Sequence, residues 1–233
     1  MASIDSPLMN RWKDLKLTED KEKIVDCSNT RASNFSARAP PALVGKVMTE
    51  KPFRVSGLFA FLHQAWKLKK NFGAREVGEN LYIFQFFAQE DKSRVLQGDP
   101  WIFDKQLILL AEVEESIAPS EVQFIHVDFW VRGYDILFGH KSKETARALA
   151  AHFGGLVEYR EIDTLGWSRY KDFRVKVNIH EPLLRGAIAS FGDAGAKWIP
   201  FKYERLPNFR YRCGGIGHVE DDCDRSEGEE DKG

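Results

Sequence analysis

Apolar positions along the chain repeat at strand spacing in some segments and at helix spacing in others. Strand-like alternation occupies residues 42–48, 74–77, 80–87 and 105–113, and helix-like spacing occupies 54–66 and 89–98. Between 54 and 66 the apolar residues recur every three or four positions, as in a helix that packs one face on a core. The order strand-helix-strand-strand-helix-strand over residues 41–115 predicts a ferredoxin-like domain, in which two helices cover one face of a four-stranded antiparallel sheet.

The same order of signals begins again after an acidic connector that contains Pro119. Strands are predicted at 124–134, 156–162, 172–180 and 197–205, a helix at 142–154 and a short helix at 182–190. Ser142 has the position of a helix N-cap, and Gly154 that of a helix stop. Residues 120–205 are therefore predicted to form a second α+β domain, and the expected fold class is α+β with tandem ferredoxin-like (RNA-recognition-motif-like) βαββαβ units.

The two ends of the chain lack this periodicity. Residues 1–40 are polar, with one short helix predicted near 19–26 and a Ser-rich segment closed by two prolines, so they read as a flexible N-terminal segment. Residues 206–224 contain closely spaced Cys and His, and residues 225–233 form an acidic tail that is predicted to be disordered.

The alternation within residues 80–87 assigns the two faces of a central strand. Polar Gln85 marks the solvent face, which Leu81 and Ile83 share. The opposite, core-facing set is aromatic: Tyr82, Phe84 and Phe86. Packing is therefore favoured over base stacking by these rings, and an open face of Leu and Ile is expected to be covered by another element or by a partner.

The strand at 172–180 directs cations to one face. Phe173, Val175, Val177 and Ile179 alternate with Asp172, Arg174, Lys176 and Asn178. Arg174 and Lys176 have a spacing that follows neighbouring phosphates, and Arg169 and Lys171 lie just upstream. The alternative is an ordinary solvated strand face. A further basic cluster between Trp66 and Phe72 also fits lysines that interact with a helix C-terminus.

Composition limits the classes of function. Hydrophobic residues make up 43% of the 233 residues, which indicates a globular chain, and the formal net charge is −1. Residues 119–205 carry 13 basic and 11 acidic side chains, so nucleic-acid binding would depend on local patches rather than on a strongly cationic surface. No apolar run is long enough to span a membrane and no secretory signal is evident, so an intracellular location is expected, with nucleus or cytoplasm unresolved.

Three residues near the C-terminus have the spacing of zinc-knuckle ligands. Cys213, His218 and Cys223 match the last three positions of the pattern C-x2-C-x4-H-x4-C, and Arg210 occupies the first. Arginine stays protonated and cannot bind zinc, so the pattern does not identify the fourth ligand. The candidates for it are water, Glu220, Asp221, Asp222, Asp224 and the distant Cys27. Gly214 and Gly217 stand where a knuckle turns, and the basic and aromatic side chains expected to contact nucleic acid are Arg210, Tyr211 and Arg212.

Several segments together resemble a known family. They are "RWKDLKLTEDKE", "ALVGKVMTEKPF", "NLYIFQFFAQEDKSRVLQGDPWIFDKQLILL" and "FKYERLPNFRYRCGGIGHVEDDC". The chain resembles plant proteins that combine an N-terminal domain of unknown function 4283 with a C-terminal CCHC zinc knuckle, and these are similar to the first reading frame of LINE-type retrotransposons. The resemblance implies binding of nucleic acid and of Zn²⁺, with no enzyme activity. Because a Cys-to-Arg change needs one base, decay of an inactive copy is an alternative for Arg210.

The expected function is therefore non-enzymatic binding of RNA or single-stranded DNA. No phosphate-binding glycine loop, H-E-x-x-H motif or nucleophile elbow occurs, and neither a catalytic residue nor a small-molecule substrate is expected. The alternative function is a protein-interaction or self-assembly module that uses the apolar sheet face of the first domain.

Overall fold

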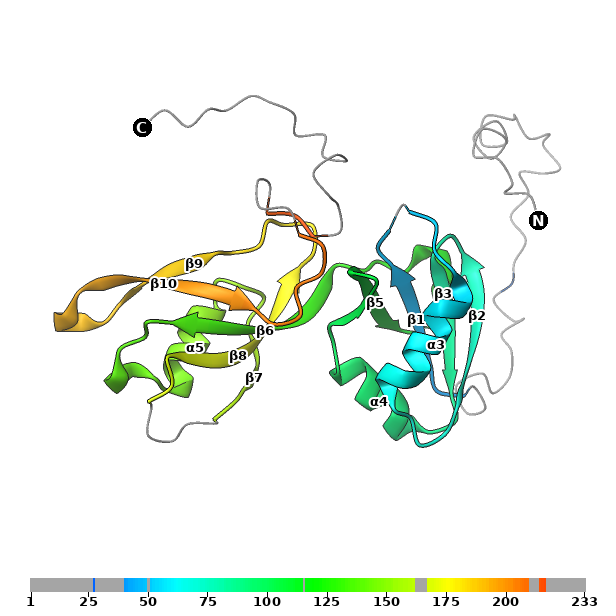
Figure 1. Ribbon diagram of the computed structural model, residues 1–233, viewed down its shortest axis with the longest axis horizontal. Coiled ribbons are helices and arrows are strands. Elements are labelled where there is room, and N and C mark those ends of the chain that lie inside the picture. Colours follow the sequence, from blue (N-terminus) through cyan, green and yellow to red (C-terminus); the bar gives the residue numbers. More distant parts are fainter. Residues whose placement is uncertain are drawn as a thin grey trace, which may run out of the picture. The chain divides into compact units, whose positions relative to one another are not determined.

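The computed structural model describes residues 27, 40–49, 51–114, 116–161, 167–209 and 214–216. The described residues from 40 onward belong to one compact unit, the larger of two into which the chain divides. The helix predicted near 19–26 and the acidic tail lie outside the described residues. The described part of the larger unit is α+β, with two five-stranded antiparallel sheets and three α-helices (Figure 1).

The first sheet has the strand order β2-β3-β1-β5-β4. Its elements are β1 (Ala42–Val47), α3 (Val55–Trp66), β2 (Phe72–Gly78), β3 (Leu81–Phe86), α4 (Gln89–Gln97), β4 (Trp101–Phe103) and β5 (Gln106–Glu112). The predicted strands and helices are all present, and β4 is a short additional strand. It pairs with β5 across a turn at Asp104 and Lys105, both of which have positive φ.

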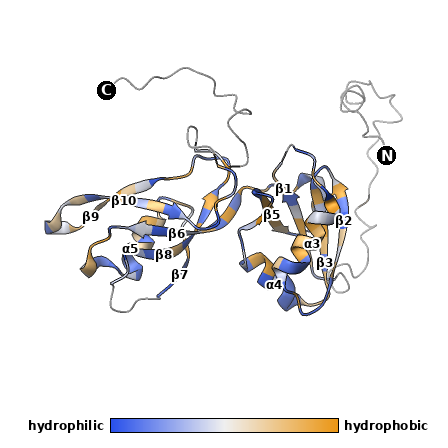
Figure 2. Ribbon diagram, viewed as in Figure 1, coloured by the Kyte–Doolittle hydropathy of each residue, from blue (hydrophilic) through white to orange (hydrophobic). Residues whose placement is uncertain are grey.

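Helices α3 and α4 bury an aromatic core against one face of this sheet. Leu58, Leu62 and Trp66 of α3 and Val95 of α4 share a buried cluster with the sheet. The β3 side chains in that cluster are Tyr82, Phe84 and Phe86, as the alternation predicted. Orange segments of α3 in Figure 2 mark its apolar residues. The helices therefore remove these rings from any contact with a ligand on the open face.

The open face of the first sheet is partly covered by the same chain. Val44, Leu81, Leu107 and Leu109 are buried, and the last two belong to the same buried cluster as Phe129 of the second sheet. A 3-10 turn, η1 (Pro119–Glu121), lies against β2 and β3. The expectation that this apolar face would be covered is confirmed for these positions. Their burial is favourable because it removes apolar surface from water.

The second sheet has the strand order β7-β8-β6-β10-β9. Its elements are β6 (His126–Tyr134), η2 (Phe138–His140), α5 (Lys143–Ala150), β7 (Leu156–Tyr159), β8 (Tyr170–Asn178), β9 (Gly186–Ser190), η3 (Gly192–Ala194) and β10 (Ala196–Tyr203). Thr145 N–H donates to Ser142 Oγ over 3.3 Å, so Ser142 caps α5 as predicted. Helix α5 contributes Ala146, Leu149 and Ala150 to the core of this sheet.

The short helix predicted over residues 182–190 is wrong. Gly186–Ser190 is strand β9, paired antiparallel with β10. A Cβ at position 186 would lie 2.4 Å from Trp198 Cζ2, so glycine lets the indole of the neighbouring strand pack over the backbone. Ala187 is buried while Ile188 is exposed, which is the period of a strand. The described residues around the second sheet therefore include one α-helix, α5, and do not repeat the helix content of the first sheet.

Candidate nucleic-acid interface

Arg174, the central cation predicted on β8, is buried rather than solvated. Its side chain is 6% exposed, and its Nη1 and Nη2 donate to the carbonyl oxygens of Gln97 and Asp99 over 2.6 and 3.4 Å. Carboxylate oxygens of Asp128 and Glu158 lie 3.6 and 3.9 Å from its nitrogens. The alternation of β8 was predicted correctly, but the expectation of an exposed guanidinium is corrected, because the last residue of α4 and the segment after it cover this position.

Lys171 also departs from the expected surface position. It is buried, and it shares the core-facing side of β8 with Phe173. Its ammonium nitrogen lies 5.9 Å from the centre of the Tyr159 ring. Lys176 and Arg169, by contrast, are exposed. Two of the four predicted cations of this strand are therefore on the surface.

Sequence reasoning missed the aromatic side chains on the open face of the second sheet. Val127, Phe129 and Val131 of β6 are buried, which places Trp130 and Tyr134 on the opposite side. Tyr134 is the register partner of Tyr170 on β8, and the two ring centres are 5.2 Å apart. The alternation of apolar residues in "HVDFWVRGY" was the available signal, because it places Trp130 and Tyr134, both half-buried, on the side opposite the core-facing residues.

Each of these three rings has a cation above it. The Arg160 guanidinium carbon lies 3.8 Å from the centre of the Trp130 ring, and that of Arg132 lies 4.7 Å from Tyr170. Lys202 Nζ, on β10, lies 5.0 Å from the centre of Tyr134. Such distances give cation–π attraction. We call the set Trp130, Arg132, Tyr134, Arg160, Tyr170 and Lys202 the aromatic face.

Carboxylates balance part of this positive charge. Arg132 Nε lies 3.3 Å from Asp172 Oδ1, and its Nη2 lies 2.5 Å from Glu204 Oε1. Burial alone would lower the pKa of Arg132, but Glu204, Tyr170 and Asp172 together raise it. Burial also raises the pKa of Asp172, against the opposing effect of Arg132. The surface is thus aromatic with local cations rather than strongly positive, which favours contact with bases over binding to phosphates alone.

The described start of the knuckle is anchored to the second sheet. Phe209 and Ile216 form a β-bridge, and Ile216 is buried in the core of that sheet. Leu183 N–H donates to the Gly214 carbonyl over 2.8 Å. Gly214 has φ +75°, and a Cβ there would lie 2.9 Å from Pro182 Cβ, so this position favours glycine, as the knuckle pattern has it.

The predicted ligands and contact residues of the knuckle fall outside the described residues. These are Arg210, Tyr211, Arg212, Cys213, His218 and Cys223. Among residues that the structure does describe, no group of three or more His, Cys, Asp or Glu is arranged to hold a metal ion. The chemistry of the three remaining donors, two thiolates and an imidazole, fits Zn²⁺, and the arginine in the first position does not.

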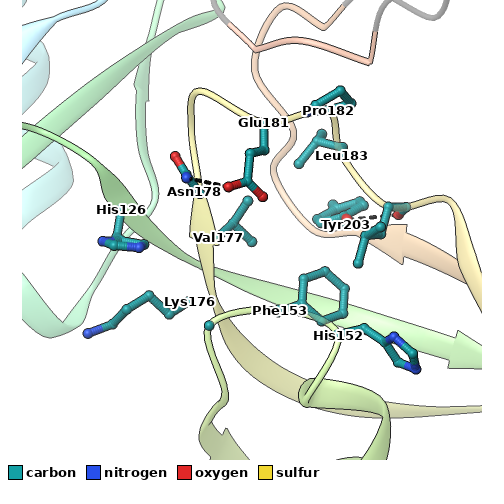
Figure 3. A pocket seen from close by; sticks show the side chains of 12 residues that line it. His126, His152, Phe153, Lys176, Val177, Asn178, Glu181, Pro182, Leu183 and Tyr203 are labelled. Carbon is teal, nitrogen blue, oxygen red and sulfur yellow. Dashed lines mark hydrogen bonds between the residues drawn. The ribbon is translucent and has the colours of Figure 1, made fainter.

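A cavity of about 230 Å³ lies at the end of β8 near the loop that carries Pro182 (Figure 3). Asn178 Nδ2 donates to Glu181 Oε1 over 2.7 Å, and Tyr203 Oη donates to the Leu184 carbonyl over 2.8 Å. Burial raises the pKa of Tyr203, so this hydroxyl stays protonated. These polar groups of the cavity therefore already have hydrogen-bond partners within the chain.

Two segments of the chain match known protein families. Residues 37–121 match the family model described as "Domain of unknown function (DUF4283)", and residues 177–225 match the one described as "Zinc knuckle". The chain combines a DUF4283 domain with a zinc-knuckle segment. No curated protein and no solved structure matches the chain. The two parts of the resemblance noted from the sequence are therefore confirmed. No helix in the described part of the chain is long and apolar enough to cross a membrane.

Most of the aromatic face lies between the two matched segments. The DUF4283 domain contains the first sheet, whose core-facing rings are buried, and the zinc-knuckle match begins at the end of β8 and includes β9 and β10. Of the aromatic face, Lys202 alone falls within a match, and Trp130, Tyr134 and Tyr170 fall between residues 122 and 176. Neither family match therefore includes Trp130, Tyr134 or Tyr170.

Proposed function

We propose that this chain is a non-enzymatic protein that binds RNA or single-stranded DNA on the aromatic face of its second sheet. The observation that carries the proposal is the position of Trp130, Tyr134 and Tyr170 on adjacent central strands, each with a cation within 5.0 Å of the ring centre. Unpaired bases expose their ring surfaces and stack on aromatic side chains, whereas bases in a duplex do not.

The strand orders support a ferredoxin-like assignment for both sheets, which we include in the proposal. Each sheet places its first strand between the third and the last, as in β2-β3-β1-β5 and β7-β8-β6-β10. Strands β4 and β9 are then additions at one edge. In this arrangement the two central strands are those that present side chains to RNA in RNA-recognition motifs, and here they are β6 and β8.

The zinc-knuckle segment supports nucleic-acid binding through its family match. We propose that Cys213, His218 and Cys223 retain weakened Zn²⁺ binding, and that Arg210, Tyr211 and Arg212 add contacts to nucleic acid. A retrotransposon origin and an intracellular location belong to the same proposal. The anchoring of Gly214 and Ile216 on the second sheet supports a segment that acts beside this sheet rather than apart from it.

Fluorescence anisotropy with a labelled single-stranded RNA tests the aromatic face. Trp130→Ala and Tyr170→Ala should each weaken binding by about 1–3 kcal/mol, because each removes one stacking surface. Lys176→Ala should instead reduce the slope of log affinity against log salt concentration by about one, because one fewer counterion is released on binding. Phe87→Ala is the matched control, since Phe87 is an exposed aromatic residue at the end of β3 in the DUF4283 domain. Unchanged affinity in both aromatic-face variants would refute the proposal.

Native mass spectrometry with added zinc tests the knuckle. Arg210→Cys restores a fourth thiolate, so the variant should bind one Zn²⁺ per chain more tightly than the original sequence. One equally tight Zn²⁺ in both proteins would show that another residue supplies the fourth ligand and that Arg210 does not weaken the site.

A further inference from the structure

Strand β9 forms an edge of the second sheet that lacks the usual protection. Among the described strands it pairs with β10 alone, and its residues, Gly186–Ser190, include no charged side chain. The other edges differ: β2 and β7 contain charged residues and irregular register, and β4 has three residues. Charge, bulges and shortness are the features that prevent edge strands from pairing with other chains. Strand β9 has none of them.

The backbone of β9 presents hydrogen-bonding groups outward. Phe201 N–H donates to the Arg185 carbonyl over 2.8 Å, and Pro200, the partner of Gly186, has no N–H. Because bonded and non-bonded pairs alternate in an antiparallel ladder, Gly186, Ile188 and Ser190 direct their N–H and C=O groups away from β10. These groups are arranged to accept another strand.

An apolar pair accompanies this edge. Ile188 is 70% exposed, and its register partner on β10, Trp198, is 55% exposed. Ile199 and Phe201 are buried, so Trp198 shares the open side of β10 with Lys202 of the aromatic face. A strand added at β9 would cover both side chains and continue the sheet on the same side.

We propose that β9 pairs antiparallel with β9 of a second copy of this chain, centred on Ile188. The strand is self-complementary in that register: Ile188 faces Ile188, Gly186 faces Ser190, and Ala187 faces Ala189, with no like charges opposed. The two-fold axis is perpendicular to the sheet, so the contact closes on itself as a dimer and leaves both aromatic faces on the same side. The pairing goes beyond the proposed binding of nucleic acid and does not require it.

Sedimentation velocity of the full, nuclease-treated chain over a wide concentration series tests the pairing. The original sequence should show a monomer–dimer equilibrium. Ile188→Lys should sediment as a monomer, because two ammonium groups would face each other at the centre of the pair. The matched control is Val157→Lys, an exposed residue on β7 at the opposite edge, which should still dimerise. Circular dichroism melting should show that both variants stay folded.

Hydrogen exchange locates the contact independently of mass. The amide of Ile188 should exchange slowly in the dimer and rapidly in Ile188→Lys, while amides of β7 remain unchanged. A monomer at every concentration overturns the proposal, as does a dimer that Ile188→Lys leaves intact. Loss of the dimer in both lysine variants, or rapid exchange at Ile188 in the dimer, also overturns it. Since no RNA is present, none of these outcomes depends on the function proposed for the aromatic face.

Discussion

The two sheets have the same strand order but opposite uses for their aromatic side chains. In the DUF4283 domain the rings of β3 face α3 and α4 and fill the core. In the second sheet, Trp130 and Tyr134 of β6 face away from α5, while alternate residues of the same strand are buried. Strand order therefore does not decide which sheet carries aromatic rings on its open face; the phase of the aromatic residues relative to the helix-covered face decides it.

The two sheets also differ in what covers the face that the helices leave open. In the first, apolar Leu107 and Leu109 pack into the core cluster of the second sheet. In the second, the open face is polar and aromatic, and near its centre Arg174 donates to carbonyl groups of Gln97, the last residue of α4, and of Asp99. The second sheet thus uses one part of this face for packing within the chain, while the aromatic face lies around Trp130, Tyr134 and Tyr170.

The largest expected effect separates a core ring from a surface ring. Phe84→Ala should lower the free energy of unfolding by about 3–5 kcal/mol, because it leaves a cavity beside Trp66 and Phe72. Tyr170→Ala should lower it by less than about 1 kcal/mol, since its ring lies on the open face. Urea unfolding followed by circular dichroism measures both. Similar losses in the two variants would contradict the assignment of the two faces.

The next effect separates Arg174 from Lys176 on one strand. Arg174→Met should destabilise the chain by about 2–3 kcal/mol, because charge-assisted hydrogen bonds to Gln97 and Asp99 are lost and two carboxylates lose their partner. Lys176→Met, at an exposed position, should change stability by no more than about 0.5 kcal/mol. Thermal and urea unfolding of the two variants measure this difference. Equal stability of the two variants would contradict the burial of Arg174.

A third effect depends on pH, through the buried carboxyl of Asp99. Burial raises the pKa of its carboxyl to about 8, although Arg174 lowers it, and Asp128 adds to the increase. The unfolded carboxyl loses its proton near pH 3.9, so stability should fall as pH rises from about 4 to about 8 and level off above. Because one proton is involved, the free energy of unfolding should change by at most about 1.4 kcal/mol per pH unit.

Asp99→Asn removes this titration and tests it. The variant should have a flatter profile of unfolding free energy between about pH 5 and pH 8 than the original chain, measured by urea unfolding at several pH values. Asp104→Asn is the matched control, because Asp104 is exposed in the following turn. Parallel profiles for the original chain and Asp99→Asn would show that the buried carboxyl does not titrate in this range.

Local pattern predicted much of the fold, and its errors have distinct causes. Alternation identified the buried sides of β3 and β8, because successive side chains of a strand point to opposite faces whatever surrounds them. The helix expected over 182–190 is wrong because a short apolar run fits both helix and strand, and pairing with β10 decided between them. Strand β4 was missed because three residues carry too little pattern.

The sequence by itself determined the order of the elements other than β4 and β9, the DUF4283 and zinc-knuckle resemblances and the arginine in the first ligand position, because these depend on spacing along the chain. Tertiary structure alone decided that Arg174 is buried, since the carbonyls that bind it belong to Gln97 and Asp99, about 75 residues earlier in the chain. It also decided that Arg160 and Lys202 meet Trp130 and Tyr134, because residues from separate strands become neighbours when the sheet forms.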